Sequence, residues 1–271
     1  MVGCGGTGGF LAEAVCRLLL GRRARLFLVD PDRVEPHNVA RQAFDAADTG
    51  RFKAQVLAER LARRFGRGVG YSVLPYDAGL HARVFGGARS RLNLLVGCVD
   101  NGAARRALAA TLDDDRAGYA GDGSQRPRQA VWWLDAGNGR NSGQVLLGNA
   151  TRARGLRGAF PPGEERCRSL PAPSLQRPDL LEVPPAAPEP QTAPDCAQAV
   201  ARGDQGPTVN QVAAALAASY VEKLLVGTCG WMATYFDLDD GTLRCVPADP
   251  TTVAAVAGLR RDAVAPPARA A

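Results

Sequence analysis

The sequence predicts an α/β fold, a Rossmann-like, doubly wound and mostly parallel sheet that ends in antiparallel hairpins. A glycine-rich loop near the start opens a helical pattern, as in nucleotide-binding βαβ units. Short apolar runs then alternate with helical patterns through the first half of the chain, which is typical of a parallel sheet. Two hairpin patterns in the second half add antiparallel strands.

The elements of the first half follow from the spacing of apolar residues. Helical spacing predicts helices over residues 9–20, 53–65 and 103–112. Continuous apolar runs predict buried strands at residues 26–30, 71–74 and 92–96. Only Met1 and Val2 precede the glycine loop, so the first strand of the sheet is apparently missing. Because a strand typically has about 5–6 residues, we expect the functional chain to begin with about six or more additional residues.

The second half is predicted to contain a long helix between two hairpins. Thr208 is expected to cap this helix, whose apolar residues continue to Leu225. The turn of the first hairpin is placed at Asn138-Gly139, a dipeptide that suits tight hairpins. The paired strands are residues 131–135 with 143–147, and residues 233–238 with 242–246.

Residues 1–258 are predicted to form a single domain. Ten of the chain's 19 prolines fall within residues 161–194. Proline lacks a backbone N–H group and interrupts helices, so residues 151–205 are expected to form a crossover loop within the domain. Residues 259–271, rich in alanine, proline and arginine, are predicted to be a disordered tail.

Composition excludes several classes of protein. The 271-residue chain has no apolar run of membrane-spanning length and shows no secretion signal at its start. Its seven scattered cysteines argue against a disulfide framework and predict reduced thiols in the cytoplasm. The net charge is +6, but the basic residues are scattered and all except Lys53 and Lys223 are arginine. Because nucleic-acid surfaces have clustered charge, this pattern disfavours a nucleic-acid partner.

The glycine-rich loop contains the pattern G-x-G-x-x-G at Gly3, Gly5 and Gly8. Such glycines let the backbone approach phosphates that face the start of a helix. Asp30 lies at the end of the next strand, where a carboxylate can accept hydrogen bonds from ribose hydroxyls. These residues alone fit any dinucleotide-binding domain, including a nicotinamide-dependent oxidoreductase.

Three further segments distinguish between nucleotides. Residues 30–42, Asp-Pro-Asp-Arg-Val-Glu-Pro-His-Asn-Val-Ala-Arg-Gln, resemble the signature D-x-D-x-V-x-x-S-N-L-x-R-Q of the ThiF/MoeB/ubiquitin-activating superfamily, also described as HesA/MoeB/ThiF. Lys53 follows at the distance found in that family, and residues 97–101 resemble its C-x-D-N segment. His37 stands where the family usually has serine, which leaves the role of this position open.

The resemblance implies ATP and Mg²⁺ as cofactors, and a homodimer. It places Gly3, Gly5, Gly6 and Gly8 along the nucleotide and Asp30 at the ribose. It assigns Asn38, Arg41 and Lys53 to the triphosphate and Asp100 to Mg²⁺, with Arg41, Lys53 and Asp100 in the catalytic set. The assignment makes physical sense, because a carboxylate that attacks a phosphate needs cations to offset the repulsion between two anions.

Other residues of these segments have simpler interpretations. Asp32, Glu35 and His37 are interpreted as ordinary loop residues, and His81 has no partner motif. The Trp132-Trp133 pair is interpreted as part of the sheet core rather than as a binding platform.

The cysteines help to place the chain within the superfamily. Many relatives hold zinc with two C-x-x-C pairs, and this sequence has no C-x-x-C, so we expect no zinc. Asp195-Cys196, ahead of Gly206-Pro207 and the long helix, resembles the segment that carries a reactive cysteine in ThiF-type proteins. Cys167 is the alternative, because Arg166 and Arg168 would favour its thiolate. A third interpretation is that every cysteine is inert.

Residues 132–148 and 170–181 resemble a narrower group, the ThiF family protein of the bacterial PRTRC system. The resemblance implies a ThiF-type adenylation domain that activates the C-terminal carboxylate of a small ubiquitin-like protein, with transfer to a cysteine as a second step. A conjugating-enzyme-like protein is a further implied partner. The alternatives are an inactive scaffold that binds a ubiquitin-like partner, and adenylation of a non-protein substrate such as a tRNA base.

Overall fold

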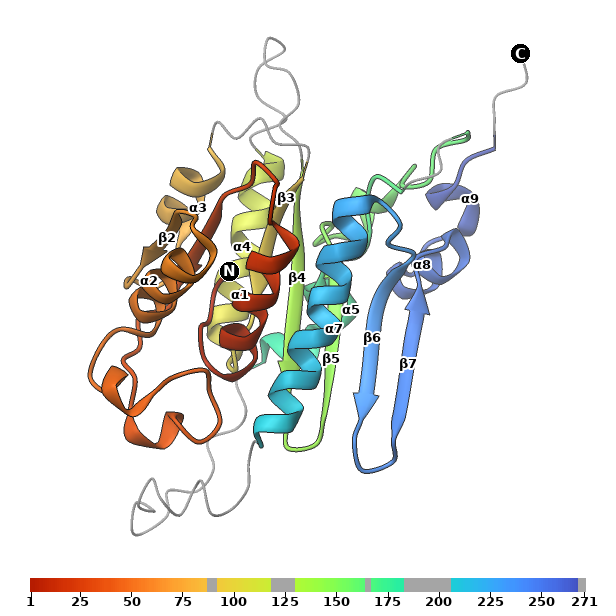
Figure 1. Ribbon diagram of the computed structural model, residues 1–271. Helices are drawn as coiled ribbons and strands as arrows, with labels where there is room; N and C mark the ends of the chain where they lie inside the picture. The colour runs from red at the N-terminus through yellow and green to blue at the C-terminus, as the bar shows by residue number, and fades with distance from the viewer. Residues whose placement is uncertain (87–91, 118–129, 164–166, 183–205, 268–271) are drawn as a thin grey trace.

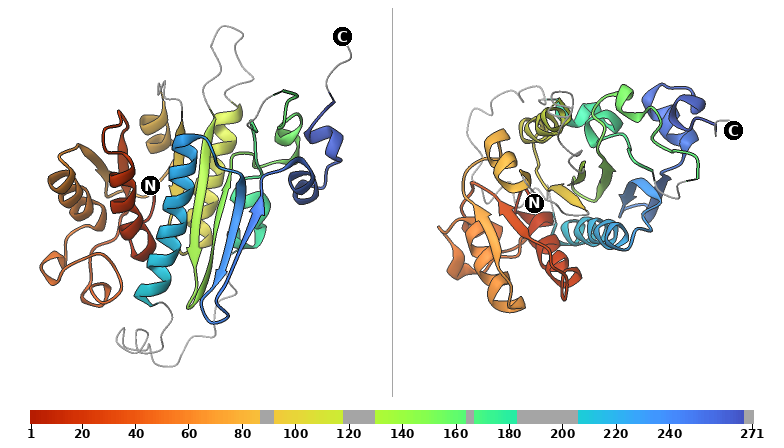
Figure 2. Two further views of the ribbon diagram at one scale, coloured as in Figure 1. Left: turned by 45° about the vertical axis from the view of Figure 1, so that its right-hand side comes forward. Right: turned by 90° about the horizontal axis from the view of Figure 1, so that it is seen from above.

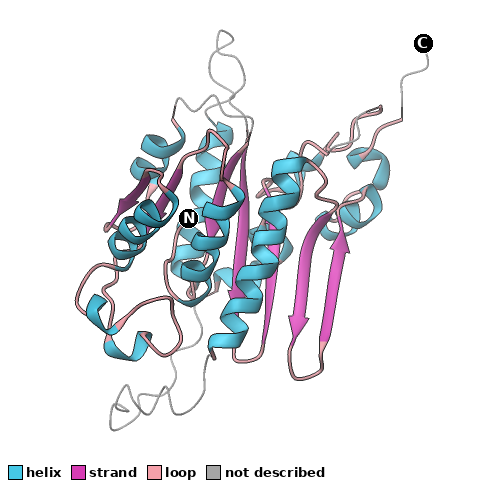
Figure 3. Cartoon of the chain, viewed as in Figure 1, coloured by secondary structure: helices cyan, strands magenta, loops and turns pink. Residues whose placement is uncertain are grey.

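The computed structural model describes residues 1–86, 92–117, 130–163, 167–182 and 206–267. It confirms the α/β class, with strands that lie between helices (Figures 1 and 3). A two-stranded sheet pairs β1 with β2, and a five-stranded sheet has the order β3-β4-β5-β6-β7. The strands are β1 (Leu26–Val29), β2 (Val69–Ser72), β3 (Asn93–Gly97), β4 (Val131–Asn138), β5 (Ser142–Gly148), β6 (Trp231–Asp237) and β7 (Thr242–Pro247).

The N-terminal part of the sheet is parallel and the C-terminal part is antiparallel. β1 pairs with β2 and β3 with β4 in parallel, whereas β4 to β7 pair successively in antiparallel orientation. Val2 pairs in parallel with both Val29 of β1 and Gly97 of β3, so it lies between the two sheets. Its backbone exchanges 2.8 Å hydrogen bonds with Val96 and Cys98. As predicted, no strand precedes the first helix in the described part of the chain.

Helices cover both faces of the sheet (Figure 2). Seen from above, α1 and α7 lie on one face and α4 lies on the other. α1 packs along α7, and α7 contacts β4 and β5. The α-helices are α1 (Gly6–Leu18), α2 (Lys53–Phe65), α3 (Ala78–Phe85), α4 (Gly102–Ala117), α5 (Pro173–Gln176), α7 (Pro207–Val226), α8 (Pro250–Ala257) and α9 (Arg261–Val264); the 3₁₀ helices are η1 (Pro36–Asn38), η2 (Ala46–Asp48), η4 (Ala153–Leu156) and η5 (Pro178–Leu181).

Two apolar clusters hold these layers together. The larger joins α1, α2 and α7 to the sheet through residues such as Leu11, Leu57 and Tyr220. The second packs Leu108 of α4 against Trp133 of β4. Trp133 is 1% exposed, which confirms that it belongs to the core. Full burial of one such side chain contributes about 1.5–3 kcal/mol, so these clusters fix the sheet on which the site is built.

The long helix begins differently from the prediction. Gly206, not Thr208, is the N-cap residue of α7, and Pro207 occupies the first helical position. Proline suits that position because its N–H group is not needed there and its φ is already helical. In the part of the chain that the structure describes, no helix has the length and apolar character needed to cross a membrane.

Two segments predicted to lack structure contain helices. In the proline-rich crossover segment, prolines begin α5 and η5 instead of only blocking helix. In the predicted tail, α9 forms and Val264 is fully buried, so the prediction of disorder is wrong for the described residues 259–267. The backbone of Ala263 and Val264 accepts hydrogen bonds from Gly158 and Phe160, which explains this order.

Candidate nucleotide site

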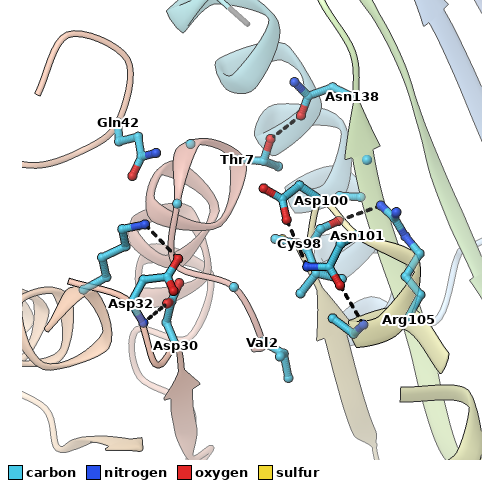
Figure 4. A pocket seen from close by; sticks show the side chains of 18 of the residues that line it. Val2, Thr7, Asp30, Asp32, Gln42, Cys98, Asp100, Asn101, Arg105 and Asn138 are labelled. Atoms are coloured by element: carbon cyan, nitrogen blue, oxygen red, sulfur yellow. Dashed lines mark hydrogen bonds and ion pairs between the residues drawn. The ribbon is translucent and has the colours of Figure 1, made fainter. Parts of the chain in front are cut away.

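A cleft of about 890 Å³ opens at the carboxyl ends of β1 and β3, beside the start of α1 (Figure 4). Ligands bind at this edge in open α/β sheets. Figure 4 shows Asp30 and Asp32 on one side of the cleft and Asp100 and Asn101 on the other. The predicted residues that line it are Gly3, Gly5, Gly6, Asp30, Asn38, Arg41, Lys53 and Asp100.

The glycines of the loop serve different purposes. Gly3 has a φ of +88°, and a Cβ there would lie 2.3 Å from the carbonyl oxygen of Cys98. A Cβ on Gly8 would lie 2.0 Å from the carbonyl oxygen of Gly3. Gly8 does not line the cleft, so the structure assigns it to close backbone packing rather than to a nucleotide contact. Gly5 and Gly6 line the cleft directly.

The cleft receives the N-terminal ends of two helices. α1 begins at Gly6 without a side-chain cap, which leaves its first N–H groups open to the cleft. α4 begins at Gly102, and Asn101 accepts a 2.8 Å hydrogen bond from the N–H of Ala104. Helix N-termini carry partial positive charge and favour bound anions. The cleft therefore suits phosphate groups.

Lys53, the first residue of α2, lines the cleft. It is 8% exposed, and its Nζ lies 3.1 Å from Oδ2 of Asp32. Asp32, interpreted from the sequence as an ordinary loop acid, thus pairs its exposed carboxylate with the lysine amine. Asp30 accepts hydrogen bonds from the N–H groups of Cys4 and Asp32, at 2.7 and 2.8 Å. Burial raises the pKa of the Asp30 carboxyl, and these hydrogen bonds oppose that shift.

The segment after β1 brings Asn38, Arg41 and Gln42 to the cleft. Asn38 is 3% exposed, and its Oδ1 accepts a 3.0 Å hydrogen bond from the N–H of Glu35. Gln42 is 9% exposed, and its Oε1 has no hydrogen-bond partner among the described residues. Gln42 belongs to the recognised signature, yet no role was predicted for it.

Asp100 and Asn101 form the opposite wall of the cleft. Asp100 is exposed, and its carboxylate accepts a 3.2 Å hydrogen bond from the Asn101 amide. Mg²⁺ in nucleotide sites commonly takes one or two carboxylates together with phosphates and water. The described residues contain no cluster of three or more metal-ligating side chains, so a metal here would depend on phosphate oxygens. An exposed carboxylate beside the N-terminus of α4, in the cleft that the N-terminus of α1 also lines, fits that arrangement.

Sequence reasoning missed a polar ring at the β4 end of the cleft. Thr7 of α1 donates a 2.7 Å hydrogen bond to Asn138 at the end of β4. The Asn138 amide in turn donates to Oδ1 of Asn210 in α7, at 3.1 Å. Thr7 and Asn210 are 203 residues apart in sequence, and nothing in the sequence links them.

A buried ion pair underlies the same wall. Nε of Arg105 donates a 3.1 Å hydrogen bond to Oδ2 of Asp135, which is fully buried. Arg105 also donates to the carbonyl oxygen of Val99, at 2.7 Å. Burial raises the pKa of the Asp135 carboxyl to about 6, and Arg105 opposes the shift. The indole nitrogen of Trp133 faces this carboxylate, but Oδ1 has no hydrogen bond of ordinary geometry among the described residues.

The thiols follow the prediction only in part. Cys196 lies outside the described residues. Burial, with a smaller contribution from nearby Cys229, raises the pKa of Cys167 to about 11. Arg166 lies outside the described residues, so the effect of the two neighbouring arginines on this thiol stays a prediction. Burial likewise raises the pKa of Cys4, and that of Cys98 to about 12, which agrees with packing roles.

Two histidines lie near the cleft. His37 lines it, with Nδ1 3.2 Å from the carboxylate of Glu35. His81 has a partner that the sequence did not reveal, because its Nδ1 lies 2.5 Å from the hydroxyl of Tyr76. Tyr76 lines the cleft, whereas His81 is 4% exposed and packs against Phe85.

Comparison with known proteins identifies what this chain resembles. A model of the ThiF family matches residues 1–243. The ATP-dependent ubiquitin transferase-like protein Cap2 of Escherichia coli (strain TW11681) is 42% identical over 62 residues, which are 22% of this chain and 10% of Cap2. The structure of PaaA matches 91% of this chain and 71% of its own, with 14% identity and a TM-score of 0.57.

The structure of E. coli MccB with AMPCPP and MccA is also similar. The match covers 91% of this chain and 62% of that one, with 16% identity and a TM-score of 0.52. At such identities the two structural matches bear on the fold alone. The chain spans about a tenth of Cap2 and less than two thirds of MccB.

Proposed function

This chain belongs to the ThiF family, and on that basis we propose that it is an ATP-dependent adenylyltransferase that acts on the C-terminal carboxylate of a protein. The observation that carries the proposal is the cleft, where the N-terminus of α1, the N-terminus of α4 with Asp100 beside it, and the amine of Lys53 come together. Cationic and dipolar groups so placed stabilise phosphates. The ThiF signature supplies the residues in the required order.

The proposed reaction is a displacement at the α-phosphorus of ATP. A carboxylate oxygen of the substrate bonds to phosphorus, the bond to the bridging oxygen breaks, and pyrophosphate leaves with its electron pair. Lys53 and Arg41 offset the negative charge that builds up on the leaving group. Asp100 would hold Mg²⁺, which supplies further charge neutralisation when bound. The product is a mixed anhydride between the substrate and AMP.

The proposed substrate is a small ubiquitin-like protein, and a homodimer and a conjugating-enzyme-like partner belong to the same proposal. Its support is the resemblance of residues 132–148 and 170–181 to the ThiF protein of the PRTRC system. Two similar proteins agree with this proposal. MccB was crystallised with MccA, and Cap2 is described as ubiquitin transferase-like.

ATP–pyrophosphate exchange tests the function. The chain is incubated with Mg²⁺, ATP, labelled pyrophosphate and a candidate ubiquitin-like protein, and label is followed into ATP. We expect exchange with the free C-terminus and none when that C-terminus is amidated. If calorimetry shows tight binding of NAD and none of ATP, the proposed reaction is wrong. Binding of ATP and partner without exchange would instead indicate a scaffold.

Replacing Asp100 by alanine is expected to lower exchange by about 10²–10³-fold, because the site loses the charged group that we assign to Mg²⁺. The Mg²⁺ concentration for half-maximal exchange should also rise. Asp240→Ala is the matched control, since Asp240 is exposed in the turn between β6 and β7, away from the cleft. Equal Mg²⁺ dependence in the Asp100 variant and in wild type would contradict the assignment.

The fate of the acyl group is a separate prediction. We propose that Cys196 attacks the acyl-adenylate through sulfur, forming a thioester as AMP leaves, because thiolates are strong nucleophiles at neutral pH. Cys196→Ala should keep pyrophosphate exchange and lose any thiol-sensitive adduct with the partner. Mass spectrometry of the adduct checks this, with Cys167→Ala as the control. An adduct that survives in Cys196→Ala and disappears in Cys167→Ala would show that Cys167 is the nucleophile. If wild type forms no adduct, the reaction stops at the acyl-adenylate.

A further inference from the structure

Asn210, in the first turn of α7, connects three separate parts of the cleft. It is 1% exposed. Its Oδ1 accepts a 3.1 Å hydrogen bond from Asn138 and lies 3.4 Å from Oγ1 of Thr7. Its Nδ2 donates a 3.3 Å hydrogen bond to the carbonyl oxygen of Arg41. A side chain far along the sequence thus joins α1, β4 and the segment after η1.

The contact between Asn210 and the glycine loop is tight. A Cβ on Gly6 would lie 2.4 Å from Nδ2 of Asn210 and 2.5 Å from its Cγ. A separation below about 3 Å would force one of the two groups to move. The amide of Asn210 therefore packs directly against Gly6 and fixes the distance between the start of α7 and the N-terminus of α1.

Asn210 also fixes the backbone that carries Arg41. The N–H of Arg41 donates to the carbonyl oxygen of Asn38, at 3.1 Å, and the carbonyl oxygen of Arg41 accepts from Asn210. The backbone of Arg41 is thus held at both of its polar groups. Neighbouring Val39 and Ala40 are exposed, so little packing restrains this turn.

We propose that Asn210 is a positioning residue for triphosphate binding, which holds Arg41 at the correct distance from the N-terminus of α1. The proposal rests on the proposed function, since it requires ATP in the cleft. In this arrangement the start of α1 meets the α-phosphate, and Arg41 meets the phosphates that ATP has and AMP lacks. Asn210 therefore raises the affinity for ATP and has little effect on the affinity for AMP.

The test compares ATP and AMP by calorimetry in the presence of Mg²⁺. Asn210→Leu keeps the branched shape but cannot form hydrogen bonds. We expect its affinity for ATP to fall about tenfold, the loss typical of one or two hydrogen bonds, and its affinity for AMP to change less than twofold. If this variant does not fold, Asn210→Ser replaces it, with the same expectation.

Two controls separate positioning from stability. Tyr220 lies on α7 like Asn210, and Tyr220→Phe removes its 2.8 Å hydrogen bond with Thr234 of β6. This variant should lower stability without changing the ratio of the two affinities. In an Arg41→Ala background, Asn210→Leu should cause no further loss of ATP affinity, because residues that act together are non-additive. Equal losses for ATP and AMP, or additive losses with Arg41→Ala, would overturn the proposal. A wild type that binds neither nucleotide would refute the proposed function itself.

Discussion

Lys53→Ala is expected to lower ATP–pyrophosphate exchange by about 10²–10³-fold, the usual cost of removing one preorganised donor from a charged transition state. The lysine amine enters the cleft from the first turn of α2 and lies 3.1 Å from Asp32. Without it, Asp32 also becomes an unneutralised carboxylate beside the site proposed for ATP. We therefore expect ATP binding to weaken together with turnover, as calorimetry and exchange rates would show.

Lys223→Ala is the matched control, because Lys223 is the chain's other lysine. Its Nζ lies 5.0 Å from the ring centroid of Trp231, and it does not line the cleft. This variant should keep wild-type exchange. Lys53→Arg should recover only part of the activity, since a planar guanidinium does not reproduce the compact charge of an amine. Full activity in Lys53→Ala would contradict the assignment of the triphosphate site.

Arg105→Met should lower the free energy of unfolding at neutral pH by about 3–5 kcal/mol, which is typical when one partner of a buried ion pair is removed. Asp135 is fully buried, and the substitution removes its cation. Urea unfolding measures the loss. Arg177→Met is the control: Arg177 and Asp179 form an exposed pair, and such pairs contribute only about 0–1 kcal/mol.

The loss caused by Arg105→Met should depend on pH. The pKa of Asp135 is raised from 3.8 to about 6 in the folded protein, so its protonation favours folding below pH 3.8 and this benefit disappears as the pH rises through about 6. Without Arg105 the folded-state pKa rises further. The variant should therefore approach wild-type stability as the pH falls from 7 towards 4. A difference that stays constant over this range would show that Asp135 is not the group involved.

Periodicity predicted the helix that begins with Lys53, one of the residues proposed to bind phosphate. The predicted bounds of α2, residues 53–65, agree with the structure, since its apolar stripe and Gly66 mark both the face and the end of the helix. α3 and α8 were not predicted from the sequence. Asp77 and Asp249 cap these helices, and an aspartate followed by a short, alanine-rich segment was too weak a pattern to be recognised.

The site was predicted from its motifs, whereas its supporting contacts were not. Arg41, Lys53 and Asp100 were identified because a linear signature carries them, and the structure brings all three to one cleft. Asn210 and Asp135 have no signature of their own. Their roles depend on packing between segments that are distant in sequence, which local propensity and spacing do not encode.

The close approach of Gly6 to Asn210 has a consequence for how related sequences can differ. A side chain at position 6 would overlap the side chain at position 210, so substitutions at the two positions are coupled in evolution. A lineage in which position 6 gains a methyl group must first shorten the side chain at position 210, and one that keeps asparagine at 210 retains glycine at 6. Across an alignment, these two columns should covary even though neither side chain is a reacting group.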